Sequence, residues 1–197
     1  MTAFEQLDLL FEKNNGIVKT AQVLESGITK PTFYAYVKER GIEQAAHGIY
    51  VSPDAWMDTM YLLHLRYAQA VFSHESALFF HDLTDREPDP YSVTVKTGYN
   101  PTSLKADGIK VYSIKKELHH AGIITMNTSF GNPVPVYDAE RTICDLIRCR
   151  SGIETQTFQG ALKQYAKRKE KNLRQLMHYA RMFHVEKLLR QYLEVLL

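Results

Sequence analysis

A segment bracketed by two glycines, GITKPTFYAYVKERG at residues 27–41, constrains the fold of this chain more than any other. Gly27 permits the positive φ of a tight turn, and Pro31 falls in the first turn of a helix, where a backbone N–H is not needed. Thr29 or Lys30 is the expected cap of this helix, and the closing glycine is its expected end. The segment therefore predicts a short helix that directly follows a tight turn.

The elements around this helix predict a helix-turn-helix with a wing. A helix over 21–25 precedes the turn, and two short helices joined by a turn of a few residues form a helix-turn-helix. A helix over 4–11 and a short strand over 17–19 come before them, and a hairpin over 42–51 follows in the place of a wing. We expect an N-terminal winged helix-turn-helix domain over 1–52.

Residues 53–197 are expected to form an α+β domain with a small antiparallel sheet and C-terminal helices. Residues 98–108 are expected to be a polar hairpin loop. In the helix that Asp138 should cap, Arg141 and Asp145 are expected to form an i,i+4 ion pair of small value. The expected strands lie at 91–97, 109–114, 123–127 and 134–137. The expected helices lie near 57–69, 74–81, 139–148, 153–168, 172–183 and 186–196.

The charge of the chain is distributed unevenly. The net charge is +2, yet residues 1–52 hold 5 Lys+Arg against 6 Asp+Glu, residues 53–147 hold 8 against 12, and residues 148–197 hold 11 against 4. A basic surface suits a polyanionic partner, with an acidic protein or a merely solvated helical face as alternatives. The basic side chains that cluster in the last segment are Arg148, Arg150, Lys163, Lys167, Arg168, Lys169, Lys171 and Arg174.

The second helix of a helix-turn-helix lies in the major groove of DNA, with its N-terminal end near base edges. The side chains expected at base edges are Thr29, Lys30, Thr32, Tyr34 and Lys38. Those expected near phosphates are Lys19, Arg40 and His47. Double-stranded DNA is thus the expected partner, bound with a steep dependence on salt. Protein binding remains an alternative, because winged helices also serve as interaction modules and this domain is nearly neutral.

Residues that could support catalysis or metal binding are sparse. Pro88-Asp89 and the later Lys96 resemble part of a nuclease pattern, but Thr94 stands where the second Mg²⁺-binding acid is needed. His74 and His81 lack a third ligand and are expected to be satisfied, partly buried side chains. No glycine-rich phosphate loop is evident. We therefore expect no catalytic residue, no metal, no cofactor and no enzymatic activity.

The two cysteines and the apolar runs bear on the compartment. Cys144 and Cys149 are five residues apart on an expected helix, so they point to different faces and fit neither a zinc pair nor a disulfide framework. No stretch approaches the roughly 20 apolar residues that a membrane span needs. A reducing, cytoplasmic setting without membrane contact is the expectation.

Three strings in order, GITKPTFYAYVKERGIEQAAHGIYVSP, FSHESALFFHDLTDREP and VPVYDAERTICDLIR, resemble the AbiEi family of abortive-infection antitoxins. With the order of elements, the resemblance covers nearly the whole chain. It implies a bacterial type IV antitoxin that represses its own toxin–antitoxin operon at operator inverted repeats. It also implies that the chain counteracts a nucleotidyltransferase-like toxin without a stable complex, as part of phage resistance.

Two other functions remain open. One is a ligand-responsive winged-helix transcriptional regulator without antitoxin activity, and the other is an enzyme such as a nuclease guided by a DNA-binding module. The near-neutral first domain favours the hypothesis that the basic C-terminal helices also contact DNA across a bend, whose elastic cost is of order 1–6 kcal/mol. A monomer that pairs cooperatively on DNA is the expected state.

Overall fold

A reciprocal pair of hydrogen bonds begins the first helix. The hydroxyl of Thr2 accepts from the N–H of Glu5, and the Glu5 carboxylate accepts from the N–H of Thr2 at 2.9 Å. This capping box satisfies two of the donors that the first turn of a helix leaves without partners. Helix α1 (Ala3–Lys13) follows from it and buries Leu7 and Phe11.

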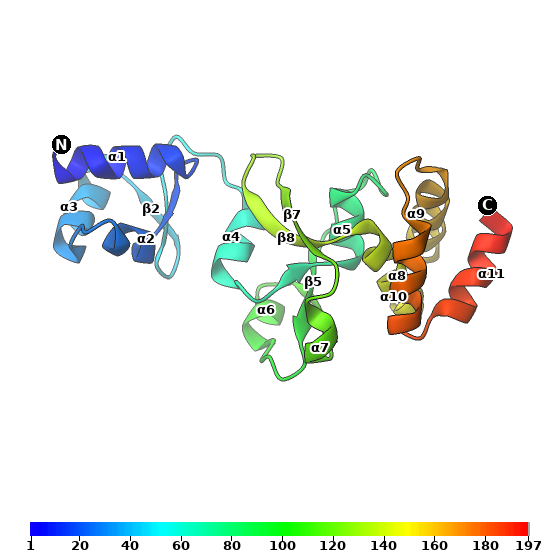
Figure 1. The fold of residues 1–197 in the computed structure, drawn as a ribbon. Coiled ribbons are helices and arrows are strands. Elements are labelled where there is room, and N and C mark those ends of the chain that lie inside the picture. The colour runs from blue at the N-terminus through cyan, green and yellow to red at the C-terminus, as the bar shows by residue number, and fades with distance from the viewer. Residues whose placement is uncertain (197) are drawn as a thin grey trace. The chain divides into compact units, whose positions relative to one another are not determined.

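The computed structural model describes residues 1–196, which divide into two compact units (Figure 1). Unit 1 comprises residues 1–68 and 127–133, and unit 2 comprises residues 69–126 and those from 134 on. Unit 1 therefore extends past residue 52 and includes a loop from the second half of the chain. Among the described residues, no helix is both long enough and apolar enough to cross a bilayer.

The elements of unit 1 follow the order that the sequence predicts, namely helix, strand, helix, helix and hairpin. After α1 come β1 (Ile17–Lys19), α2 (Thr20–Glu25), α3 (Lys30–Arg40), β2 (Glu43–Ala46), β3 (Ile49–Val51) and α4 (Thr59–Arg66). The strands form an antiparallel sheet in the order β1-β3-β2. The carbonyl of Gly48, in the β2–β3 turn, accepts from the N–H of Thr20 at 2.9 Å and so holds that turn against α2.

Aromatic side chains fill the core of unit 1. Phe11, Phe33, Tyr36 and Tyr50 are all buried, and the Phe33 and Tyr50 rings meet edge to face at 4.8 Å. Tyr36 is more deeply buried than Val37, because the Tyr36 hydroxyl donates to a carboxylate of α1 and draws the ring toward that helix.

Unit 2 contains a five-stranded sheet in the order β6-β5-β4-β8-β7. The strands are β4 (Val71–Phe72), β5 (Ser92–Lys96), β6 (Lys110–Ile114), β7 (Ile123–Asn127) and β8 (Pro133–Tyr137). The α+β class and four of these strands match the expectation. The sheet includes an antiparallel β4–β5 pair, and it also has two parallel pairs, β4–β8 and β5–β6, that the sequence does not predict. A two-residue strand such as β4 is too short to show alternation.

Residues 98–108 do not form the expected hairpin loop. Because β5 and β6 are parallel, the chain must cross from the end of one strand to the start of the other. Helix α6 (Thr102–Ala106) lies in that crossing and buries Leu104 against the sheet. A single leucine among polar residues carries no helical period, which explains the wrong prediction.

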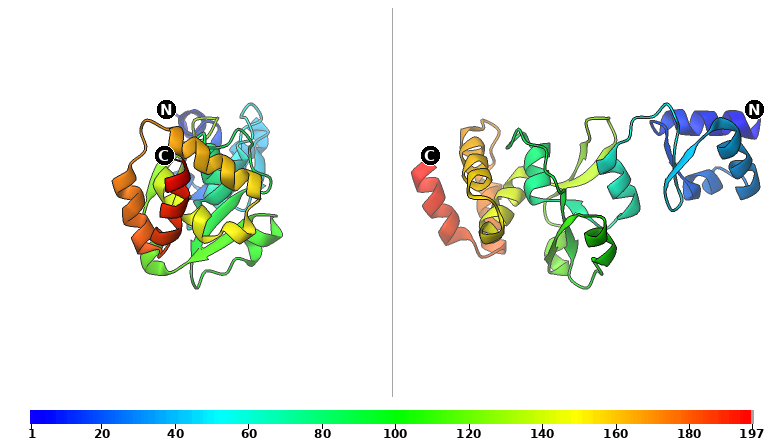
Figure 2. Two further views of the ribbon diagram at one scale, coloured as in Figure 1. Left: turned by 90° about the vertical axis from the view of Figure 1, so that its right-hand side faces the viewer. Right: turned by 180° about the vertical axis from the view of Figure 1, so that it is seen from behind.

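The remaining helices of unit 2 gather to one side of its sheet (Figure 2). They are α8 (Ala139–Arg148), α9 (Thr155–Lys167), α10 (Leu173–Met182) and α11 (Glu186–Leu196), each near its expected position. Two shorter helices, α5 (His74–Phe80) and α7 (Lys116–His119), and a 3-10 turn at Arg150–Gly152 complete the unit. Ile143, Leu146 and Ile147 of α8 pack with Leu162 of α9 and Leu176 of α10 in one apolar core.

Candidate nucleic-acid interface

The outer side of α3 is a stripe of exposed polar side chains. Lys30, Tyr34 and Lys38 are four residues apart, so they lie along one face of the helix, and all three are exposed. The opposite face buries Phe33 and Tyr36. One side of the helix therefore packs in the core of unit 1, and the other side exposes two lysines and a tyrosine to solvent.

The N-terminal end of α3 is capped by Thr29. Its hydroxyl accepts from the N–H of Thr32, and the Oγ1 atoms of the two threonines lie 2.9 Å apart. Pro31 stands in the first turn as the sequence predicts. The helix dipole gives this end partial positive charge, which favours an anion beside it.

Tyr34 lies close to Tyr50 of β3, in the hairpin. The pKa of Tyr50 is raised first by burial and then by the neighbouring Tyr34. Tyr50 also contacts Phe33, the residue next to Tyr34. Sequence reasoning missed this link, although the apolar run at Ile49–Val51 marks the strand that provides it.

Arg40 is held by α1 instead of standing free for a phosphate. Its guanidinium donates to the carboxylate of Asp8 at 2.9 Å and lies 5.8 Å from the Tyr36 ring centroid. The other oxygen of Asp8 accepts from the Tyr36 hydroxyl at 2.8 Å. Burial, followed by the Asp8 carboxylate, raises the pKa of Tyr36 to about 12. Both partners of the ion pair are half exposed, so it stabilises the fold little, but it directs Arg40 toward α1.

The other two candidate phosphate contacts have different surroundings. His47 is exposed in the β2–β3 turn. Lys19 is half-buried at the start of α2, where its N–H donates to the Gln22 side chain at 2.8 Å. Burial and the Lys19 charge both lower the pKa of His64. Lys19 is therefore less accessible than His47.

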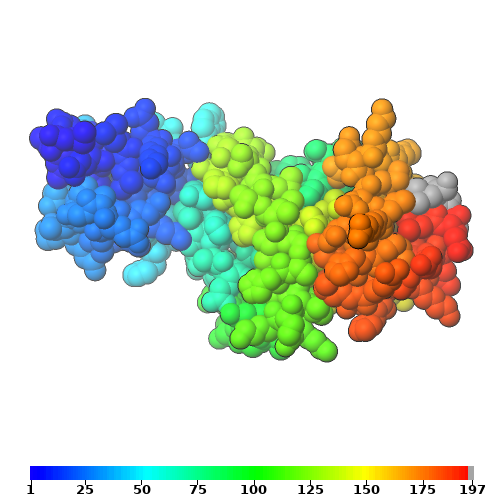
Figure 3. All heavy atoms as spheres, viewed as in Figure 1, coloured from blue at the N-terminus to red at the C-terminus, as the bar shows by residue number. Residues whose placement is uncertain are grey.

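The basic residues of unit 2 fall into two groups. Arg148 is half-buried and pairs with Asp145 at 3.2 Å, while Arg168 donates to the carbonyl of His81 and Lys171 to the carbonyl of Arg168. The exposed members are Arg150, Lys163, Lys167, Lys169 and Arg174. The connection from α9 to α10, orange in Figure 3, is part of the surface on the face shown there.

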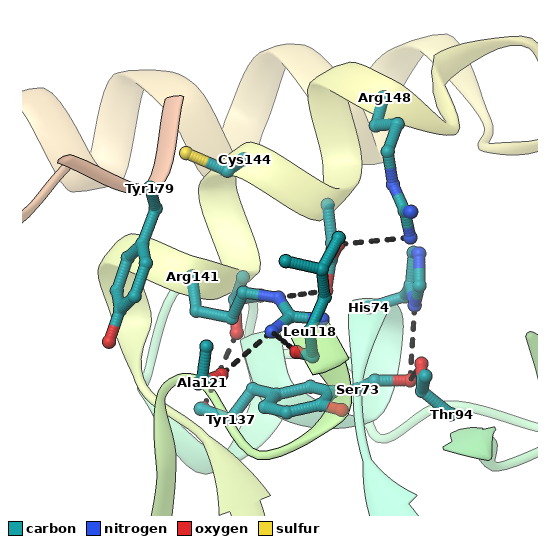
Figure 4. Close-up of polar contacts among 12 residues, drawn as sticks. Ser73, His74, Thr94, Leu118, Ala121, Tyr137, Arg141, Cys144, Arg148 and Tyr179 are labelled. Carbon is teal, nitrogen blue, oxygen red and sulfur yellow. Dashed lines mark hydrogen bonds and ion pairs between the residues drawn. The ribbon is translucent and has the colours of Figure 1, made fainter. Parts of the chain in front are cut away.

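Arg141 and Asp145 form a buried clamp and not the weak surface pair that the sequence suggests (Figure 4). Both side chains are fully buried, with 2.8 Å between Nε of Arg141 and Oδ2 of Asp145. The Arg141 guanidinium lies 4.0 Å from the Tyr137 ring centroid and 4.3 Å from that of Phe183. Arg141 also donates to the carbonyls that precede β7, those of Leu118 and Ala121. The pair thus joins α8 to two other parts of unit 2.

His74 and His81 are buried. The expectation of a satisfied, partly buried side chain is wrong for His74, which is fully buried and whose Nε2 has no hydrogen-bond partner in the described part of the chain. His74 has a positive φ of 48° and stacks on Tyr112 at 3.4 Å between ring centroids. Its Nδ1 lies 3.0 Å from the Ser73 hydroxyl (Figure 4). Ser73 in turn accepts from the Thr94 hydroxyl at 2.8 Å. Nε2 of His81 lies 2.7 Å from the carbonyl of Tyr137. No three His, Cys, Asp or Glu side chains within the described part of the chain could hold a metal ion together.

Comparison with known proteins finds similarity among solved structures. No protein-family model matches the chain, and no curated protein matches it. Among solved structures, it is similar to the one titled "Crystal structure of RV2827C protein from Mycobacterium tuberculosis", with a TM-score of 0.60 and 13% identity. The similarity covers 92% of this chain and 72% of that one. At 13% identity, this similarity supports a common fold and nothing further.

Proposed function

We propose that this chain is a sequence-specific binder of double-stranded DNA that acts as a type IV antitoxin and represses its own operon. The observation that carries the proposal is the two-sided character of α3, which buries Phe33 and Tyr36 while it exposes Lys30, Tyr34 and Lys38. A helix preceded by α2 and a tight turn has the geometry in which such a face enters a major groove.

The chemistry of the exposed face suits base edges. A lysine at the N-terminal end can donate to the guanine acceptors O6 and N7, and a threonine methyl can contact the methyl of thymine. Lys30 and Thr32 occupy the first turn of α3, the part of a recognition helix that reaches bases. His47 in the adjacent turn and the N–H groups at the start of α3 are suited to phosphates.

The antitoxin part of the proposal rests on the three strings that resemble the AbiEi family. Polar residues of the second and third strings, among them Ser73, His74, Arg141 and Asp145, are buried in unit 2. They therefore support the fold, and neutralisation of a nucleotidyltransferase-like toxin falls to surface residues. We propose a cytoplasmic, non-enzymatic protein that pairs on operator inverted repeats and forms no stable complex with the toxin.

Binding to the DNA upstream of its own gene tests the DNA-binding claim. Fluorescence anisotropy of the full chain should show that Lys30→Ala/Thr32→Ala weakens operator binding by about 1–3 kcal/mol per lost base contact. Lys13→Ala, an exposed lysine at the end of α1, is the matched control and should leave affinity nearly unchanged. Equal loss on random DNA would assign these residues to phosphates, and no loss would contradict the proposal.

Co-expression separates the two activities. The full chain should restore growth of cells that express the adjacent toxin gene. The Lys30→Ala/Thr32→Ala variant should restore growth equally well when it is expressed from an unrelated promoter, because α3 serves only repression. Failure of the wild-type chain to restore growth would favour the ligand-responsive regulator over the antitoxin.

A further inference from the structure

A cleft of about 450 Å³ lies beside α1, entirely within unit 1. Its walls come from α1, from the segment that follows β3 and from the loop at residues 127–133. The loop is fixed in place, because Asn132 donates to Asp58 at 2.8 Å and accepts from Asn15 at 2.9 Å. The volume falls in the range typical of small-molecule sites, which is about 300–1,000 Å³.

Aromatic rings line the cleft at its mouth and at its base. Trp56 is 78% exposed and Phe130 is 45% exposed, and their rings stack at 6.5 Å with 21° between planes. Phe11 and Tyr36 line the inner part. Two neighbouring exposed aromatic rings form a contiguous apolar surface of the kind that marks a binding site, and Trp56 is the single tryptophan of the chain.

The charged groups of the cleft are all acidic. Asp8, Glu12 and Asp54 line it, and no lysine or arginine does. Asp8 is engaged by Tyr36 and Arg40, as described above. Glu12 and Asp54 are exposed, and no ion pair with another described residue neutralises either carboxylate. An anionic ligand would be repelled here, and a neutral one would leave both charges unused.

From this combination we infer that the cleft binds a small organic cation, with a guanidinium or ammonium head on an apolar stem. The head can lie over the faces of Trp56 or Phe130, where the ring quadrupole attracts a cation. Its N–H groups can donate to the carboxylates of Glu12 and Asp54 in charge-assisted hydrogen bonds. The apolar stem of the ligand can displace water from the aromatic rings that line the cleft. This site is separate from the exposed face of α3, and the inference goes beyond the proposed function.

Trp56 supplies the readout, because a ligand over its ring changes its fluorescence. Agmatine, which carries a guanidinium and an ammonium on a four-carbon stem, is the probe for titration of the full chain at fixed ionic strength. A saturable change is expected, with affinity at least tenfold weaker in Glu12→Gln/Asp54→Asn. Glu43→Gln, an exposed carboxylate in β2, is the matched control and should bind as the wild type does.

Calorimetry of Trp56→Leu provides a second measurement that does not depend on fluorescence, and agmatine binding should again fall at least tenfold. Blocked arginine, N-acetyl-arginine amide, presents the same head on a peptide backbone. Tighter binding of agmatine supports a free small molecule as the ligand. Tighter binding of the blocked arginine would point to an arginine side chain of a partner protein and would overturn the inference of a small-molecule site. The inference is also overturned if sodium chloride reproduces the signal or if Glu12→Gln/Asp54→Asn binds as tightly as the wild type. None of these measurements involves DNA, so their failure leaves the proposed function standing.

Discussion

Helices α3 and α8 both begin at a side-chain oxygen, yet they place their polar residues in opposite environments. Thr29 caps α3, and Asp138 caps α8 by accepting from the N–H of Arg141 at 2.7 Å. In α8 every residue from Arg141 to Ile147 is buried, whereas α3 buries only Phe33 and Tyr36. The same capping chemistry therefore starts one helix that is enclosed by the fold and one that is half open to solvent.

The difference indicates which charges are available to a partner. Arg141 is fully buried, pairs with Asp145 and lies against the rings of Tyr137 and Phe183, so it stabilises the fold and is not accessible to a partner. Lys30 and Lys38 are exposed and remain available to a partner. Substitutions of polar residues in α8 should therefore lower the free energy of unfolding more than substitutions on the exposed face of α3. Binding to a partner should depend on α3 and not on α8.

The largest effect is expected from Arg141→Met. The change leaves the carboxylate of Asp145 buried without its closest cation and removes donors from the carbonyls of Leu118 and Ala121. Breaking a buried pair from one side costs about 3–5 kcal/mol. Urea unfolding of the full chain, followed by circular dichroism, measures the loss. A loss below about 1 kcal/mol would show that α8 is as tolerant as α3 and would break the comparison.

The double variant Arg141→Met/Asp145→Leu is the control for that experiment. It removes both charges from the interior, so it should be less destabilising than Arg141→Met alone. Arg148, which is partly exposed, can turn toward water when Asp145 is gone. A double variant that unfolds more readily than the single one would mean that the pair itself, and not the stranded carboxylate, dominates the energetics.

The second-largest loss of stability is expected from Gly122→Ala, because Gly122 packs against Arg141. Gly122 has a φ of +80°, and a Cβ there would lie 2.8 Å from Cβ of Arg141 and 3.0 Å from the Tyr179 hydroxyl. Gly131 has a φ of +83° with nothing within 4 Å. Both alanine variants carry the strain of a positive φ, but only Gly122→Ala adds overpacking of about 1–3 kcal/mol. Equal losses in unfolding experiments would mean that the contact with Arg141 relaxes at no cost.

The sequence predicts those parts of the fold that depend on neighbours along the chain. Thr29 and Asp138 cap helices, and in each case the side chain accepts a hydrogen bond from the N–H three residues later. The stripe of Lys30 and Lys38 is equally local, because helical spacing alone puts these residues on one side.

What the sequence could not predict depends on residues far away in the chain. An i,i+4 pair such as Arg141 and Asp145 has the same spacing on a surface and in a core, and only Tyr137, Phe183 and two distant carbonyls decide which it is. Arg40 pairs with Asp8, 32 residues earlier, and this ion pair directs its guanidinium toward α1 and away from the candidate site. The parallel pairing of the sheet likewise follows from tertiary structure and leaves no periodic signal.

The third effect is a pH dependence that should appear in unit 2. Burial, followed by the charges of Arg148, Lys110 and Arg141, lowers the pKa of His74 well below its usual value. The unfolded chain therefore gains a proton near pH 6.5 that the folded chain does not, and His74 lowers stability as pH falls, by at most about 1.4 kcal/mol per pH unit. Between pH 7 and pH 5, the stability advantage of the wild type over His74→Asn should shrink by about 1–2 kcal/mol.

Asparagine suits the test of His74 because it tolerates the positive φ of 48° at this position. The measurement is the free energy of unfolding at several pH values. A difference between wild type and His74→Asn that stays constant with pH would mean that the buried ring is protonated in the folded protein.

The smallest effect on stability is expected at Lys38, and it tests the comparison from the other side. Lys38→Ala should change the free energy of unfolding by no more than about 0.5 kcal/mol, because its side chain is exposed and packs against nothing. If Lys38 meets a phosphate, the slope of log affinity against log salt should fall by about 1. Glu39→Ala, the exposed neighbour, should leave both quantities unchanged or raise affinity slightly. A stable Lys38→Ala variant whose operator affinity and salt slope are both unaltered would mean that exposure to solvent on α3 is not the same as contact with DNA.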